Sequence, residues 1–174
     1  MKFKTLLFLL FYVLSCTVVF SQNDVFDIAR NGTSEEIKKI NTASPGAINS
    51  KNADGYTPLI LACYKGNVDV VKFLVKNSNT INIPSGMGTA LMAATYKGQA
   101  EIVKLLLENK ANPNLSDDNG MTPLMYATIS SNKNIIKLLL DYKADKLLTN
   151  KEGKTAFEFA VFSGNQDIIQ QLKN

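Results

Sequence analysis

The chain has 174 residues, of which 45% are hydrophobic and 20% are charged, which is ordinary for a globular protein. It contains no histidine, so the commonest general base and metal ligand of enzymes is absent. Without Lys2 and Lys4, the 19 basic residues become 17 against 15 acidic ones, and this net charge of +2 gives no support to nucleic acid or an acidic membrane as a partner.

The first 21 residues have the order of a secretory signal peptide, which is basic, then apolar, then small. Two lysines supply the basic start, residues 5–20 are a run of 16 residues without a charge, and Ser21 precedes a polar segment. We expect cleavage after Ser21. This would place residues 22–174 in the periplasm or outside the cell, with no membrane span.

Two alternatives are open for this segment. One is an uncleaved membrane anchor, although the apolar run is shorter than the ~20 residues of a spanning helix. The other is a lipid anchor on Cys16, because residues 13–16 (VLSC) loosely resemble a bacterial lipoprotein signal. Cleavage after Ser21 leaves Cys63 as the only cysteine, so no disulfide can then form within the chain.

Beyond this segment, the same residue types recur at intervals of 32, 33 and 33 residues. Such self-similarity is the signature of a stacked repeat protein. The recurring positions hold Thr57, Thr89, Thr122 and Thr155, then Ala62, Ala94, Ala127 and Ala160, then Gly66, Gly98, Ser131 and Gly164.

Each repeat is predicted to contain two short helices. The recurring threonine can cap a helix, and in two repeats a proline follows it at the first helical position. Apolar residues at helical spacing predict the second helix, as in residues 102–107. Segments rich in Asn, Asp and Gly, such as residues 52–55 and 117–120, predict turns between repeats. The expected fold class is therefore all-α.

Two stretches resemble ankyrin repeats, namely DGYTPLILACYKGNVDVVKFLV (residues 54–75) and NGMTPLMYATISSNKNIIKLLL (residues 119–140). The elements of the family pattern match in order, namely the turn, Thr-Pro-Leu, Ala, Gly and the paired apolar residues. The resemblance covers residues 23–174. It implies an ankyrin-repeat solenoid of about five helix-turn-helix units with projecting hairpin loops. The expected units are residues 23–51, 52–83, 84–116, 117–149 and 150–174.

Polar residues in the two outer units predict a complete small domain rather than a fragment of a longer array. Gln171 and Lys173 in the last unit, and Lys38 in the first, occupy positions that are apolar in the inner units. Terminal repeats of a solenoid need such a polar outer face.

The chain departs from the family pattern where ankyrin repeats often have histidine after Thr-Pro-Leu. The hydrogen bonds of that histidine are expected to be absent or replaced. The residues that stand there are Ile60, Met92, Met125 and Glu158.

Two further departures concern turns. The family's glycine after the second helix is replaced by Ser78, Lys110 and Lys143, and a left-handed backbone at any of them costs about 1 kcal/mol relative to glycine. The neighbouring Asn77 and Asn109 are alternative positions for that conformation. The hairpin SGMG before the third unit's threonine is one residue short, so we expect a distorted or mobile turn there.

No catalytic residue, cofactor or metal site is predicted. Cys63 is interpreted as a small buried hydrophobe rather than a reactive thiol. Residues 86–88 (GMG) lack the Lys-Ser/Thr ending of a phosphate loop, and residues 117–120 lack the alternating ligands of a calcium loop. The chain is therefore expected not to be an enzyme.

A surface is the functional feature that the resemblance implies, formed by hairpin tips and exposed residues of the first helices. Register places Tyr64, Tyr96, Ile129 and Phe162 in a row, and tyrosine is enriched in binding hot spots. The alternative is that these side chains only shield the stack by packing over neighbouring helices. The candidate protein-binding residues are Arg30, Asp54, Tyr56, Tyr64, Lys65, Tyr96, Lys97, Met121, Ile129, Glu152, Lys154 and Phe162.

The expected function is that of a monomeric, non-enzymatic protein–protein interaction module outside the cytoplasm, with an unidentified protein partner. The alternative is a structural or protective envelope accessory that stabilises or regulates a neighbouring enzyme. Both interpretations depend on the family resemblance, because fold alone does not dictate function.

Overall fold

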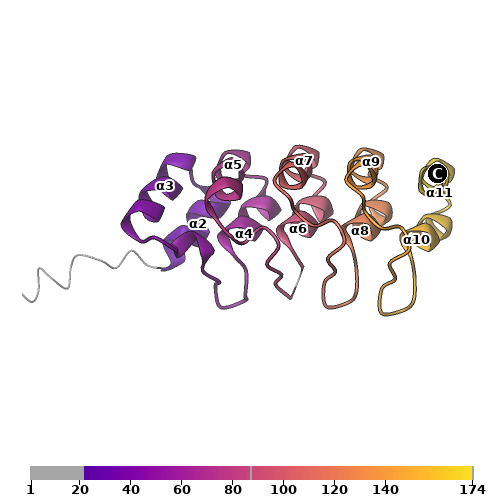
Figure 1. Ribbon diagram of the computed structural model, residues 1–174, viewed down its shortest axis with the longest axis horizontal. Coiled ribbons are helices and arrows are strands. Elements are labelled where there is room, and N and C mark those ends of the chain that lie inside the picture. Colours follow the sequence, from indigo (N-terminus) through magenta and orange to yellow (C-terminus); the bar gives the residue numbers. More distant parts are fainter. Residues whose placement is uncertain (1–21, 87, 174) are drawn as a thin grey trace, which may run out of the picture.

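The computed structural model describes residues 22–86 and 88–173, and Figure 1 shows them as a row of paired helices. The predicted signal segment, its cleavage point after Ser21 and the alternative lipid site Cys16 lie outside the described residues. Within those two ranges the chain forms ten α-helices and one short 3-10 helix, which confirms the all-α fold class. No helix found there is long and apolar enough to cross a membrane.

Each pair consists of a first helix and a second helix joined by a short turn. First helices lie side by side in one layer, second helices form the other, and the loops between pairs project together on one side (Figure 1). A 3-10 helix, η1 (Ala47–Asn49), follows the first pair. The pairs are α2 (Gln22–Asn31) with α3 (Ser34–Ala43), α4 (Pro58–Lys65) with α5 (Val68–Asn77), α6 (Ala90–Tyr96) with α7 (Ala100–Glu108), α8 (Pro123–Ile129) with α9 (Lys133–Asp141), and α10 (Ala156–Ser163) with α11 (Gln166–Lys173).

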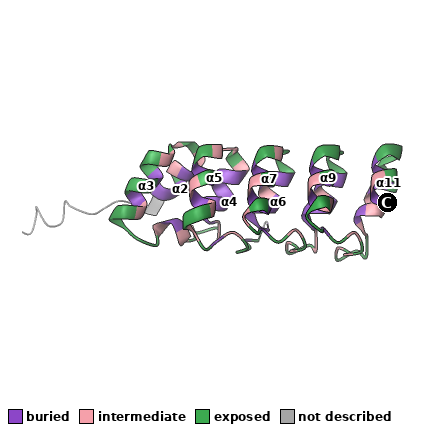
Figure 2. Ribbon diagram, turned by 45° about the horizontal axis from the view of Figure 1, so that its top comes forward, coloured by how far each residue is buried: buried purple, intermediate pink, exposed green. Residues whose placement is uncertain are grey.

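The core is continuous along the row, because each pair buries its apolar sides against the next. Buried residues line the helix surfaces that face one another (Figure 2). Leu59, Leu91 and Leu124 repeat at one position of the first helices and are at most 1% exposed. Burial of each such side chain contributes about 1.5–3 kcal/mol. The recurring alanines of the first helices are 0% exposed, and their small size lets neighbouring first helices approach closely.

Threonine caps start the first helices, as the sequence predicted. The hydroxyls of Thr57, Thr89, Thr122 and Thr155 each accept a hydrogen bond from a backbone N–H three residues later, at 3.3 or 3.4 Å. At two positions the residue in place of the family's histidine completes the cap. Met125 Sδ accepts from the Thr122 N–H at 3.5 Å, and Glu158 Oε2 accepts from the Thr155 N–H at 2.6 Å.

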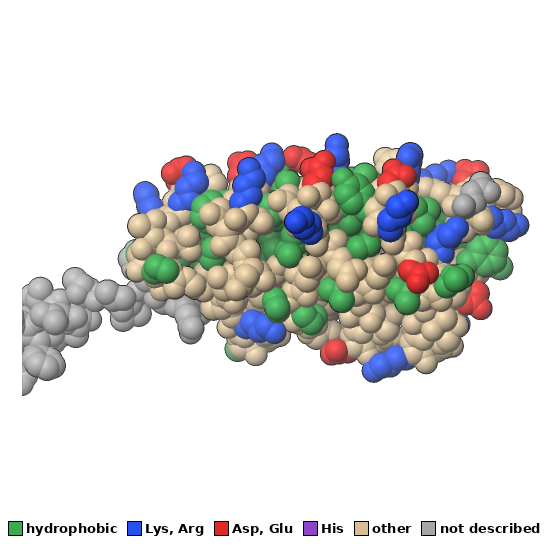
Figure 3. Space-filling view, in the orientation of Figure 1, with side chains coloured by type: hydrophobic (Ala, Val, Ile, Leu, Met, Phe, Trp, Pro, Cys, Tyr) green, Lys and Arg blue, Asp and Glu red, His purple; other side chains and the backbone are tan. Residues whose placement is uncertain are grey.

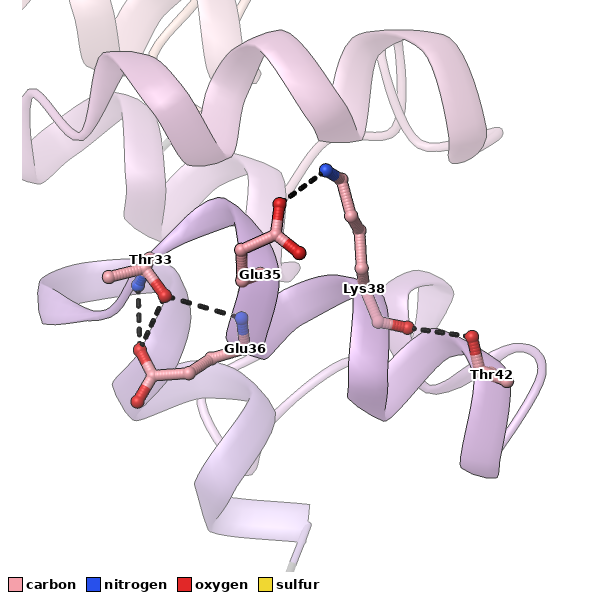
Figure 4. A network of polar contacts seen from close by, with 5 residues as sticks. All are labelled: Thr33, Glu35, Glu36, Lys38 and Thr42. Atoms are coloured by element: carbon pink, nitrogen blue, oxygen red, sulfur yellow. Dashed lines mark hydrogen bonds and ion pairs between the residues drawn. The ribbon is translucent and has the colours of Figure 1, made fainter.

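A reciprocal cap also starts α3. Glu36 N–H donates to the Thr33 hydroxyl at 3.3 Å, while Glu36 Oε2 accepts from the Thr33 N–H at 2.8 Å (Figure 4). Glu35 and Lys38 form an exposed ion pair at 2.6 Å beside this cap. The hydrogen bonds from Thr33 lower the pKa of Glu36 below its ordinary value of 4.5.

Asparagine side chains connect consecutive repeats. Asn49 Oδ1 accepts from the Asn79 N–H at 2.9 Å, and Asn82 Oδ1 accepts from the Asn112 N–H at 2.8 Å. The same contact recurs one repeat later, where Asn114 Oδ1 accepts from a backbone N–H at 2.7 Å. Asn67 Nδ2 donates to the Gly32 carbonyl at 2.8 Å. These bonds fix the loop of one repeat on the loop of its neighbour.

Lys110 and Lys143 take the left-handed conformation that their alignment with a family glycine suggested, with φ of 69° and 67°. Ser78 does not, because the second helix of that repeat ends differently. Its φ is −102° and its N–H caps the Leu74 carbonyl from an extended backbone. Asn109 does not take the left-handed conformation either, since its φ is −98°.

The hairpin of the third repeat is one residue shorter than its counterparts. Ser85 and Gly88 exchange both backbone hydrogen bonds, at 3.0 and 2.9 Å, across two intervening residues. In the other hairpins, three residues intervene, as between Asn52 and Tyr56. Asn52 Oδ1 there also accepts from two backbone N–H groups of its own turn. The turn of the third repeat is therefore tighter than the others, while the distorted or mobile turn expected from the sequence stays a prediction.

We predict that Lys110→Gly and Lys143→Gly each raise the free energy of unfolding by about 0.5–1 kcal/mol, because glycine tolerates positive φ. Urea unfolding followed by circular dichroism measures the change. Ser78→Gly is the matched control, since it adds backbone freedom without relieving strain, and it is expected to lower stability. Equal stabilisation by Ser78→Gly would contradict the explanation.

We predict that the Glu36 cap makes a pH-dependent contribution to stability. The folded pKa lies below 4.5, so the contribution is complete above that value and is lost as pH falls through the lower folded pKa. Wild type should therefore be more stable than Glu36→Gln at pH 7, and the difference should shrink as pH falls below 4.5. A difference between their urea midpoints that is as large at pH 3 as at pH 7 would argue against this origin.

Candidate functional site

The aromatic row consists of Tyr64, Tyr96, Ile129 and Phe162, which occupy equivalent positions near the ends of α4, α6, α8 and α10. Tyr96 is 61% exposed, Ile129 52% and Phe162 94%, whereas Tyr64 is half-buried. The ammonium group of Lys97 lies 4.9 Å from the centre of the Tyr64 ring, where the ring face attracts a cation. Shielding of neighbouring helices thus accounts for Tyr64 better than for the other three side chains.

A cavity of about 490 Å³ opens on this face beside Tyr64 and Tyr96. We call it the Ala93 cavity, after one of the residues that line it. Its size lies within the usual range of ligand pockets, about 300–1,000 Å³. Among the predicted binding residues, the lining includes Arg30, Tyr56, Tyr64, Lys65 and Tyr96. It does not include Asp54, Lys97, Met121, Ile129, Glu152, Lys154 and Phe162.

Ala93 creates the hollow because its neighbours along the stack are larger. Leu61, Ala93 and Tyr126 occupy the same position in consecutive first helices, three residues before the row, and all three line the cavity. The two larger side chains form its sides, while a single methyl group leaves the middle open. The hollow is therefore a property of one repeat within a regular row.

The short hairpin of the third repeat also lacks a side chain that the neighbouring repeats have, because its last residue is Gly88. Gly88 directly precedes the capping threonine, where other repeats have Tyr56 and Met121. A Cβ atom on Gly88 would lie 2.1 Å from Met92 Sδ, and the φ of Gly88 is +92°. Met92 is buried and lines the cavity, so any larger residue at position 88 would displace its side chain.

Asp117 provides a carboxylate on the far side of the cavity from Arg30 along the stack. Its Oδ1 accepts from the Asn119 N–H at 2.8 Å and the Met121 N–H at 2.9 Å, which fixes the hairpin. Its Oδ2 accepts from the Tyr126 hydroxyl at 2.5 Å. Burial and this hydrogen bond raise the pKa of Tyr126, so the phenol stays protonated and keeps donating.

Tyr96 and Tyr126 meet edge to face, with ring centres 6.0 Å apart and planes at 82°. This is a favoured arrangement of aromatic rings. The contact connects Tyr96 of the row to Tyr126 of the cavity lining and orients both rings. The lining as a whole is aromatic and aliphatic, with charged groups at its two ends.

The sequence analysis did not predict the apolar part of the cavity lining or its acidic end at Asp117. The missed lining residues were Ile60, Leu61, Gly86, Met92, Ala93, Asp117, Asn119 and Tyr126. A usable signal existed, because aligning the repeats sets Ala93 between Leu61 and Tyr126 and Gly88 between Tyr56 and Met121.

Cys63 is 0% exposed, which confirms its interpretation as a buried hydrophobe. Burial raises the pKa of its thiol far above the ordinary value, so the nucleophilic thiolate does not form. Within residues 22–86 and 88–173, no three His, Cys, Asp or Glu side chains gather in a way that could hold a metal ion.

Comparison with protein families gives one match. A family model described as ankyrin repeats, in three copies, matches residues 25–117 and 92–174. No match was found among curated proteins.

We predict that Cys63 resists thiol reagents in the folded chain. In a Cys16→Ser variant, where Cys63 is the only cysteine, reaction with Ellman's reagent should be on the order of 100-fold slower in buffer than in denaturant, because the thiol reacts only when the fold opens. Rapid stoichiometric labelling in buffer would show that Cys63 is accessible.

Proposed function

The chain belongs to the ankyrin repeat family, and we propose that it is a non-enzymatic protein-binding module that acts outside the cytoplasm. Ankyrin repeats are protein–protein interaction modules, which sets the class of function. The observation that supports a particular surface is the aromatic row, three of whose four side chains are exposed beside the Ala93 cavity.

The exposed side chains of the row favour a binding role. Exposure of large apolar groups to water is unfavourable in free energy, and contact with a partner's surface would remove it. Contiguous exposed apolar patches mark interaction sites. Tyr96 and Phe162 project from a packed scaffold, so little conformational entropy is lost when they dock. Rigid aromatic anchors of this kind dominate the binding energy of many interfaces.

The opposite side of the stack is a solvated surface. Figure 3 shows basic and acidic side chains gathered along the second helices. Lys72 of α5 pairs with Glu101 of α7 at 3.4 Å, and Lys133 of α9 pairs with Asp167 of α11. Such exposed pairs contribute little to stability, about 0–1 kcal/mol each, but they keep this side polar. The row is therefore the better candidate for contact.

Two sequence features support the remaining parts of the proposal. The chain has no histidine, and Cys63 is buried, so neither a histidine base nor a cysteine nucleophile is at the surface that the structure describes. Export rests on the signal-like pattern of residues 1–21.

We predict that the triple variant Tyr64→Ala/Tyr96→Ala/Phe162→Ala loses its protein partner. Affinity capture from the cell-envelope fraction, read by quantitative mass spectrometry, should recover at least about tenfold less of that partner, because anchors of this type each contribute more than about 1 kcal/mol.

The matched control is Lys72→Ala/Lys104→Ala/Lys137→Ala, three exposed residues on the second helices. Circular dichroism checks that both variants are folded. Equal recovery of every captured protein by wild type and the aromatic variant would rule out the row as the binding surface.

A further inference from the structure

We propose that the Ala93 cavity binds an extended segment of the partner protein by one large apolar side chain, flanked on one side by an acidic residue and on the other by a basic residue. The proposal rests on the protein-binding role proposed for this face. It adds the chemistry of the segment and its direction along the stack.

The side chains that line the cavity favour a large apolar side chain of the partner segment, which we call the apolar anchor. Ala93 contributes only a methyl group to the lining, between the larger Leu61 and Tyr126 of the neighbouring repeats, and the rings of Tyr64 and Tyr96 also line the cavity. Tyr126 closes one end, with its hydroxyl already bound to Asp117. A side chain such as Leu, Met or Phe can therefore be enclosed there while the Tyr126 hydroxyl keeps its hydrogen bond.

The charges at the ends have opposite signs. Lys65 lines the end near α2 and α4, together with Arg30, whose guanidinium also pairs with Asp27 at 2.9 Å, and the ammonium of Lys97 lies over Tyr64 nearby. Asp117 lines the end near α8, and Asp118 Oδ2 lies 3.6 Å from the Cβ position of Gly86. An acidic residue of the segment is attracted to the first end and a basic residue to the second, which fixes the direction of binding.

Asp117 keeps capacity for a further donor. Its carboxylate accepts three hydrogen bonds, from Asn119, Met121 and Tyr126. Carboxylates offer about four lone-pair sites, so a lysine or arginine of the segment can supply the fourth. The three existing bonds hold the carboxylate in place and so reduce the entropy cost of that contact.

The spacing of the helices sets the length of the segment. The cavity is lined from α2 to α8, which is three steps between neighbouring first helices. At about 9 Å per step the span is roughly 27 Å. An extended chain rises about 3.3 Å per residue, so about eight residues cover it.

The test is selection of a phage-displayed library of random 12-residue peptides on the purified full chain. Winning peptides are synthesised and their affinities measured by fluorescence anisotropy. The expected result is enrichment of peptides with an acidic, then apolar, then basic order or its reverse, with the acidic and basic residues on opposite sides of the apolar anchor.

Ala93→Leu fills the cavity with the side chain that Leu61 already places one repeat earlier, and it should weaken these peptides at least about tenfold. Lys137→Leu adds the same side chain on the outer surface of α9 and should leave affinity unchanged. Thermal unfolding confirms that each variant is folded.

Asp117→Asn tests the acidic end while keeping the hairpin. Asn52 and Asn150 occupy the same hairpin position, and their Oδ1 atoms accept the same pair of backbone bonds. The variant should lose the preference for a basic residue, measured as the affinity ratio between Lys and Gln at that peptide position. Asn150→Asp adds a charge to a hairpin outside the cavity and should not change the ratio.

Failure to enrich any peptide, enrichment without the charge order, or equal affinity for wild type and Ala93→Leu would overturn the proposal. None of these results changes the capture experiment on Tyr64, Tyr96 and Phe162, which tests the binding function itself. Conversely, peptides that depend on Ala93, together with unchanged capture by the triple variant, would show that the cavity binds peptides but does not hold the captured partner, because Tyr64 and Tyr96 line it. That result would overturn the proposal and also reject the row.

Discussion

The structure depends on one constraint, which is that a single helix pair cannot bury its own apolar sides. Both helices of each pair are short, at most ten residues, and isolated helices of this length are only marginally stable in water. Burial comes from contact with the next pair, through alanines such as Ala94 and Ala127 that let the first helices approach. Because the packing fixes these helices in register, equivalent residues are aligned along the stack, and both the aromatic row and the Ala93 cavity result from that alignment.

The fold could be predicted almost completely from the sequence, because the same structural signals recur in several repeats. The period, the capping threonines and the apolar spacing each point to the same paired helices, and the left-handed Lys110 and Lys143 follow from alignment with glycine. Ser78 shows the limit of such alignment. Its repeat leaves the second helix by a different path, so an aligned position there has another backbone conformation.

The candidate site was predictable only in part, because row and cavity arise from different kinds of information. The row is made of large side chains that are present at one repeat position, and the register of the repeats places them, which is how Tyr96 and Phe162 were found. A hollow is made by atoms that are missing relative to neighbours, at Ala93 and Gly88. It can be recognised only when three repeats are compared side by side. Asp117 was set aside as a turn residue, which it is, although its second oxygen also faces the cavity lining.

The asparagine contacts between loops give the stack a mechanical property. Asn82 accepts from Asn112 and also donates to the Lys110 carbonyl at 3.2 Å, so it is bonded to the following repeat on both sides of its amide. Asn114 repeats this arrangement toward the next loop, with its amide 3.3 Å from the Lys143 carbonyl. These bonds therefore couple the position of each of these loops to that of its successor along the stack.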